Sequence, residues 1–146
     1  MHDIPAQIAK IMQTTGETSV KVVTHGTGSS VMGYALGKYE ESTLSFYNNF
    51  KYQYAISKVV AIAPCPISQV GKPADNTLMK SIDKVPWNVL VGQADDICPL
   101  VNVETFIKAP LAATKKLAVY TVYPNVGHRM RKFEPLIATT LPALLQ

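Results

Sequence analysis

The apolar residues of this chain gather into four short runs, which are separated by stretches with helical periodicity. The runs are rich in β-branched residues and predict buried strands at 19–24, 58–64, 86–92 and 117–123. In the other stretches apolar residues recur three and four positions apart, which predicts helices at 3–16, 29–38, 101–109 and 131–145. Alternating strands and helices are typical of a mostly parallel sheet flanked by helices. The sequence therefore predicts an α/β fold with about four strands.

Length and composition predict a single domain, residues 1–146, whose surface is partly covered by another protein. Apolar residues make up 47% of the sequence, but only 16% of residues are charged, which is low for a freely soluble monomer. The net charge of +4 is mild, and the basic cluster at 129–132 has no interleaved aromatic residues. We therefore expect a protein partner rather than a nucleic-acid partner.

Other function classes find little support in the sequence. Cys65 and Cys98 have neither the spacing of a metal site nor that of a disulfide framework, so neither feature is predicted, and no cofactor is expected. We find no apolar run long enough to span a membrane and no signal peptide, and we predict no compartment. The aromatic residues between 46 and 54 are typical of local core, and a partner-binding patch is the alternative.

The turn between the first strand and the second helix is the most informative motif. Gly26 and Gly28 permit a tight strand-to-helix turn. A buried strand, a glycine-rich turn and a helix form the context of the G-x-S-x-G nucleophile elbow of α/β-hydrolases. Residues 24–28 read Thr-His-Gly-Thr-Gly, so Gly26 stands where the nucleophilic serine would be. This elbow therefore carries no attacking hydroxyl.

An acidic residue and a histidine follow later strands in the order expected of the same fold. Asp95 comes just after strand 86–92, and His128 comes just after strand 117–123. Elbow, acid and histidine is the chain order of the α/β-hydrolase triad. Asp95 is preferred to Asp96 because it occupies the fourth position of a turn that begins at Gly92.

Taken with the helix start at 3–6 and the strand at 60–64, these motifs resemble the acid lipases, the group of gastric and lysosomal lipases. The resemblance covers most of the chain. It implies that Asp95 matches the triad acid, that His128 matches the triad base and that Gly26 takes the place of the nucleophile. It also implies that the backbone N–H of Thr27 corresponds to an oxyanion-hole donor.

The chain departs from the acid-lipase pattern in two further respects. In that family a long interval between two strands holds the lid domain, whereas here only the short segment 65–84 joins the two strands. The early strands of the family are also absent. We therefore expect part of an α/β-hydrolase fold, its C-terminal half without a lid domain, whose sheet has an open edge. A protein partner, such as a second chain that carries the N-terminal half, is expected to cover that edge.

The function hypothesis is a catalytically inactive, lipase-like fragment that acts as a structural or interaction subunit of a larger assembly. One alternative is a divergent esterase that uses Thr27, Ser29 or Ser30 as its nucleophile. Another is a lipid-binding module that keeps a pocket without chemistry. Ester turnover would favour the esterase, whereas a co-purifying lipid would favour the binding module.

Overall fold

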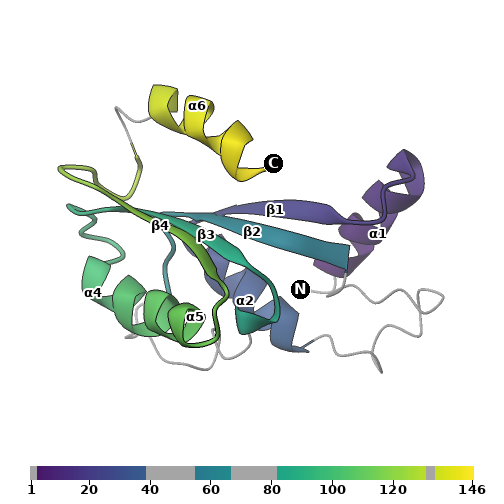
Figure 1. The fold of residues 1–146 in the computed structure, drawn as a ribbon, viewed down its shortest axis with the longest axis horizontal. Coiled ribbons are helices and arrows are strands. Elements are labelled where there is room, and N and C mark those ends of the chain that lie inside the picture. The colour runs from purple at the N-terminus through teal and green to yellow at the C-terminus, as the bar shows by residue number, and fades with distance from the viewer. Residues whose placement is uncertain (1–2, 39–54, 67–81, 131–133) are drawn as a thin grey trace.

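The chain folds into one parallel sheet with helices on both faces (Figure 1). The computed structural model describes residues 3–38, 55–66, 82–130 and 134–146. The strands are β1 (Val20–His25), β2 (Ile56–Ile62), β3 (Trp87–Gly92) and β4 (Leu117–Tyr123). The helices are α1 (Asp3–Thr15), α2 (Gly28–Lys38), η3 (Ile82–Lys84), α4 (Leu100–Val103), η4 (Glu104–Lys108), α5 (Ala109–Ala113) and α6 (Glu134–Leu144). The predicted α/β fold with a parallel sheet of four strands is confirmed.

The order of the strands in the sheet is the same as their order in the chain. Each strand pairs in parallel with the next, as β1-β2-β3-β4. Val22 lies opposite Val59, and Leu90 lies opposite Thr121. Because all four strands point the same way, the loops that follow them emerge at the same end of the sheet, the carboxyl end of the strands. That end carries every residue of the candidate site.

Two apolar cores lie on the two faces of the sheet. The larger core lies on the face that α2, α4 and α5 cover (Figure 1) and includes Trp87, Ile107 and Leu111, which are fully buried. The Trp87 indole donates a hydrogen bond to the carbonyl oxygen of Ile82 at 2.7 Å. On the other face, Ile137 of α6 packs against the smaller core, which includes Leu90. The central strand β3 is therefore buried on both faces, as parallel strands generally are.

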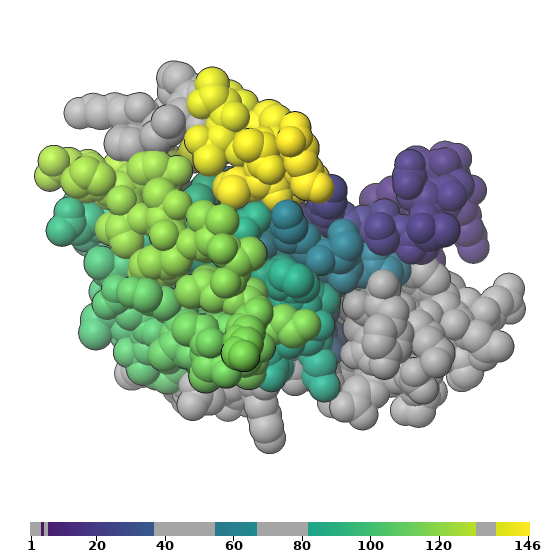
Figure 2. All heavy atoms as spheres, viewed as in Figure 1, coloured from purple at the N-terminus to yellow at the C-terminus, as the bar shows by residue number. Residues whose placement is uncertain are grey.

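The C-terminal end of α6 is bound to three strands through its carbonyl groups. Lys58 Nζ and Asn88 Nδ2 each donate a hydrogen bond to the carbonyl oxygen of Leu144 at 3.2 Å. Lys21 Nζ donates to the carbonyl oxygens of Leu145 and Gln146. Such donors satisfy the last carbonyls of a helix, and the lysine charges favour the negative end of its dipole. Figure 2 shows α6 and α1 standing apart, with the surface hollowed between them.

The prediction that the first strand is largely buried is wrong. Partly buried and exposed positions alternate along β1, in which only Thr24 is buried, and the side chain of Val23 is 43% exposed. Among the described residues β1 pairs only with β2, so it is an edge strand. An apolar groove of about 540 Å³ lies between β1 and α1 and is lined by Ile8, Ile11 and Val22, among others.

Other segments differ from their predicted bounds or lie outside the described residues. The helix predicted at 101–109 runs from Leu100 to Ala113 and includes the π-helical turn η4. The connection from β2 to β3 spans only residues 63–86. The aromatic stretch 46–54 is not part of the described residues. Within the described ranges, no helix has both the length and the apolar character needed to cross a membrane.

The raised pKa of the buried Tyr120 predicts that the protein loses stability at alkaline pH. Burial, together with the nearby Glu104 carboxylate, raises the pKa of Tyr120 from 10.0 to about 12. The unfolded chain therefore releases this proton at lower pH than the folded chain, and the free energy of unfolding falls as the pH rises from 10.0 towards 12. Denaturant unfolding at neutral pH and within this alkaline range measures the fall. It should be smaller in Tyr120→Phe and unchanged in the control Tyr34→Phe, and an equal fall in Tyr120→Phe would contradict the assignment.

Candidate functional site

The elbow predicted from the sequence is present at the end of β1. Gly26 has a φ of 56°, a left-handed conformation that favours glycine. Its N–H donates to the carbonyl oxygen of Ile62 at 3.1 Å. Its own carbonyl oxygen accepts from the N–H groups of Ser29 at 3.2 Å and Cys65 at 3.0 Å. These bonds hold the turn between β1 and α2 against the loop that follows β2.

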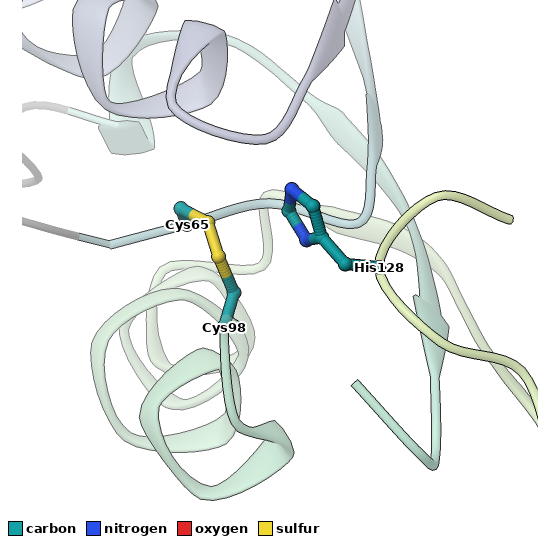
Figure 3. A group of neighbouring side chains, drawn as sticks. All are labelled: Cys65, Cys98 and His128. Carbon is teal, nitrogen blue, oxygen red and sulfur yellow. A yellow bond between two sulfur atoms is a disulfide. The ribbon is translucent and has the colours of Figure 1, made fainter. Parts of the chain in front are cut away.

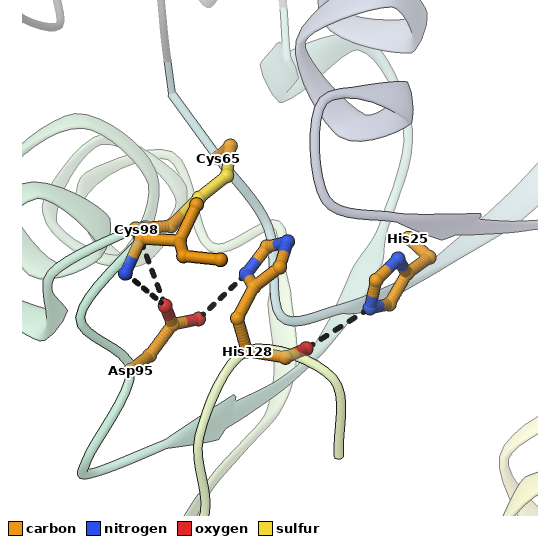
Figure 4. A network of polar contacts seen from close by, with 6 residues as sticks. His25, Cys65, Asp95, Cys98 and His128 are labelled. Atoms are coloured by element: carbon orange, nitrogen blue, oxygen red, sulfur yellow. Dashed lines mark hydrogen bonds and ion pairs between the residues drawn. A yellow bond between two sulfur atoms is a disulfide. The ribbon is translucent and has the colours of Figure 1, made fainter. Parts of the chain in front are cut away.

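Asp95 is a buried carboxylate that is fixed by three donors. It lies in the loop after β3 and is only 7% exposed. Its Oδ1 accepts hydrogen bonds from the backbone N–H groups of Ile97 at 3.0 Å and Cys98 at 2.7 Å. Its Oδ2 lies 2.9 Å from His128 Nδ1 (Figure 4). Both oxygens are engaged, so the carboxylate is held in one orientation, whereas the neighbouring Asp96 is exposed.

His128 directs its second nitrogen towards the elbow. Nδ1 contacts the Asp95 carboxylate, and Nε2 is the ring nitrogen on the side of the elbow. A Cβ atom placed on Gly26 would lie 3.1 Å from Nε2. Asp95 and His128 thus meet at the carboxyl end of the sheet, although they are 33 positions apart in the sequence. The arrangement has an acid, a base and a position for a nucleophile, but Gly26 supplies no reacting group there.

The hydroxyl groups near the elbow are placed differently. Ser29 is fully buried, and its Oγ lies 2.8 Å from Thr24 Oγ1. Ser30 is also buried and donates to the carbonyl oxygen of Cys65. Thr27 is exposed in the turn, and its carbonyl oxygen accepts from the N–H of Val31 at 3.1 Å. Both serines thus make structural hydrogen bonds in the interior, whereas His128 faces Gly26.

The expectation that the cysteines form no disulfide is wrong. Cys65 and Cys98 are bonded to each other, and the bond joins the loop after β2 to the loop after β3. They are separated by 33 positions in the sequence, but the sheet brings their Cα atoms to 5.1 Å. The pair lies beside His128 (Figure 3), and the two sulfur atoms and a ring nitrogen lie within 4.8 Å of one another. Sequence spacing does not reveal such a group, because its members come from three loops.

Two residues that the sequence reasoning did not single out also position the site. His25 donates from Nε2 to the carbonyl oxygen of His128 at 3.1 Å, and the centroids of the two rings are 5.1 Å apart. Gly92 approaches the loop after β4 so closely that a Cβ atom there would collide with the carbonyl group of Val126. The glycine at the end of a strand was a visible signal for the second contact, whereas the sequence contains no signal for the first.

No protein-family model and no curated protein matches the sequence. The structure is similar to that of a protein of unknown function from Agrobacterium tumefaciens, which is classed as a candidate α/β-hydrolase. The two sequences are 14% identical, and the TM-score is 0.61 over 97% of this chain and 57% of that one. The structure is also similar to the carboxylesterase Cest-2923 from Lactobacillus plantarum, with 14% identity and a TM-score of 0.61 over 86% of this chain and 53% of the esterase. The likeness to acyl-protein thioesterase 2 from Zea mays has 16% identity and a TM-score of 0.58, over 97% of this chain and 63% of the thioesterase.

These likenesses establish the fold alone. The chain has part of an α/β-hydrolase-like fold and spans little more than half the length of the first two structures it resembles. The structures include esterases and a thioesterase, and they give no specific support for the acid lipases. The coarser resemblance predicted from the elbow, the acid and the histidine is confirmed.

Replacing Gly92 with alanine tests how the two halves of the site are held together. The added Cβ would lie 2.8 Å from the Val126 carbonyl carbon, so the loop that carries His128 must move away from Asp95. We expect a destabilisation of about 1–3 kcal/mol, as for other overpacked positions, and a change in the His128 ring resonances. Thermal unfolding and NMR measure the two effects. Gly127→Ala is a matched control, because its Cβ would lie at an ordinary 3.6 Å from the Ala94 carbonyl oxygen. Equal effects in both variants would contradict this explanation.

Proposed function

We propose that this protein is a catalytically inactive, lipase-like hydrolase fragment that acts as a structural or interaction subunit. The observation that carries the proposal is the glycine at position 26, which faces the intact pair of Asp95 and His128. A serine hydrolase without its nucleophile keeps only the residual catalysis of its binding and oxyanion groups. The acid-lipase character is part of this proposal and rests on the motifs in the sequence.

The hydrogen bonds of the serines count against the divergent esterase. To attack an ester, Ser29 would have to leave its contact with Thr24, and Ser30 would have to leave the carbonyl oxygen of Cys65. Both changes would uncover buried polar groups, which is costly. His128, the proposed base, directs Nε2 towards Gly26 instead, and glycine has no hydroxyl.

Assays with short- and long-acyl esters test the proposed inactivity. We expect the native chain to show no turnover above the uncatalysed rate. We also expect that Gly26→Ser does not produce an efficient lipase, because the short connection between β2 and β3 provides no lid domain to exclude water. The backbone at position 26 also holds the serine in a left-handed conformation, at a cost of about 1–2 kcal/mol. Hydrolysis by the native chain that Thr27→Ala or Ser29→Ala abolishes would contradict the proposal.

The interaction role rests on the edge strand β1. A parallel sheet is normally covered on both faces, and an open edge presents unpaired backbone groups. Beside this edge lies the apolar groove between β1 and α1, and Ile11 and Val23 are 49% and 43% exposed. The structures it resembles are longer than this chain. The occupant that fits these features is a protein partner that adds further strands of the hydrolase sheet next to β1.

Substitutions on the two edge strands test this role. The chain alone should self-associate, because the apolar edge is uncovered, and light scattering over a range of concentrations measures its mass. Val23→Lys should reduce the association, since it places a charge on β1. Val119→Lys is a matched control on β4, where the side chain is 37% exposed, and it should leave the association unchanged. A cooperative monomer whose mass is independent of concentration would contradict the proposal, and a co-purifying lipid would favour the binding module.

A further inference from the structure

The disulfide and His128 form a group of potential metal ligands at the centre of the site. Cys65 and Cys98 are 2% and 4% exposed, and each offers one sulfur atom. His128 offers a ring nitrogen, and all three atoms lie within 4.8 Å of one another (Figure 3). The three residues come from the loops after β2, β3 and β4, which the parallel sheet holds together at the carboxyl end of its strands. The sheet thus arranges the group before any ligand binds.

The donor set matches the chemistry of zinc. Two thiolates and an imidazole form a mixed sulfur and nitrogen set, and Zn²⁺ binds such sets in tetrahedral geometry. Bonds of about 2.3 Å to sulfur place two thiolates of a tetrahedral site ~3.8 Å apart. Separated thiols in the positions of Cys65 and Cys98 need only a small displacement to reach that spacing, because their Cα atoms are 5.1 Å apart.

Asp95 provides the outer-sphere support that a histidine ligand normally has. Its Oδ2 holds His128 Nδ1 at 2.9 Å, which leaves Nε2 as the nitrogen available to a metal. A carboxylate in this position fixes the orientation of the ring and strengthens the imidazole as a ligand. Asp95 also accepts from the N–H of Cys98, so one carboxylate positions two of the three ligands.

We propose that the reduced protein binds a zinc-type cation through Cys65 Sγ, Cys98 Sγ and His128 Nε2, and that the disulfide and the metal exclude each other. A dithiol reductant transfers two electrons and two protons to the disulfide and is itself oxidised to a disulfide. The metal then displaces the two thiol protons and forms two bonds to sulfur and one to nitrogen. The bound cation takes the lone pair of His128, so the base is no longer free. This proposal depends on the ligand geometry and not on the proposed lack of esterase activity.

Titration of the full chain with Co²⁺ tests the site. The chain is reduced with a dithiol under anaerobic conditions, freed of reductant and titrated in parallel with the oxidised chain. We expect the reduced chain to bind one Co²⁺ with the thiolate-to-cobalt charge-transfer absorption of a tetrahedral site, and Zn²⁺ to displace it. The oxidised chain should show no such absorption. A reduced, folded chain without the charge-transfer band would overturn the proposal.

Variants separate the ligands from their surroundings. Cys65→Ser and Cys98→Ser should each weaken Co²⁺ binding at least about a hundred-fold and diminish the charge-transfer band. Asp95→Asn should weaken binding about 10–100-fold, as is typical of the loss of an outer-sphere partner. Asp96→Asn is the matched control for Asp95→Asn, because Asp96 lies in the same loop but its side chain is exposed, and this variant should bind normally.

Thiol protection provides a measurement that requires no variant. In the reduced native chain, Zn²⁺ should slow alkylation of both cysteines, and circular dichroism confirms that the chain is folded. Alkylation at the same rate with and without Zn²⁺ would overturn the proposal. Because neither measurement involves ester turnover, failure of the metal site can be told apart from failure of the proposed inactivity.

Discussion

The candidate site depends on the hydrogen bonds of the buried Asp95 carboxylate. A carboxylate in the interior is costly unless donors satisfy it, and here the donors are two backbone N–H groups and His128. These bonds tie the loop after β3 to the loop after β4. They also fix Cys98, so the same group arranges both the acid–base pair and the sulfur atoms. A change at Asp95 therefore affects both His128 and the loop that carries Cys98.

In the proposed function, the site differs from a hydrolase triad at one position. Gly26 retains the left-handed turn of an elbow and lies against His128, but it has no reacting atom. Two buried sulfur atoms and the imidazole of His128 lie within 4.8 Å of one another beside this turn. An arrangement that favours proton transfer in the presence of a hydroxyl favours soft metal ligation when the cysteines are reduced. The proposed inactivity depends on Gly26, whereas the proposed metal site depends on the placement of the two cysteines and His128.

The described sheet has a well-covered centre and two partly exposed edge strands, β1 and β4. β3 is buried along its whole length, because α6 packs on one face and α4 and α5 pack on the other. β1 is half-exposed, and the groove beside it is largely apolar. An edge of this kind is an association site unless another strand or chain covers it. The proposed interaction role follows from this asymmetry rather than from the chemistry of the site.

Local patterns in the sequence determined the four strands, the elbow, and the positions of Asp95 and His128 after their strands. Such features depend on periodicity and on neighbouring residues, and chain order alone placed the acid and the histidine at one edge. Only the tertiary structure revealed the disulfide between Cys65 and Cys98 and the contact of His25 with His128, because these pairs are distant in the sequence. It also decided that β1 is half-exposed. Burial depends on what packs against a strand, and the strand's own apolar residues do not specify that.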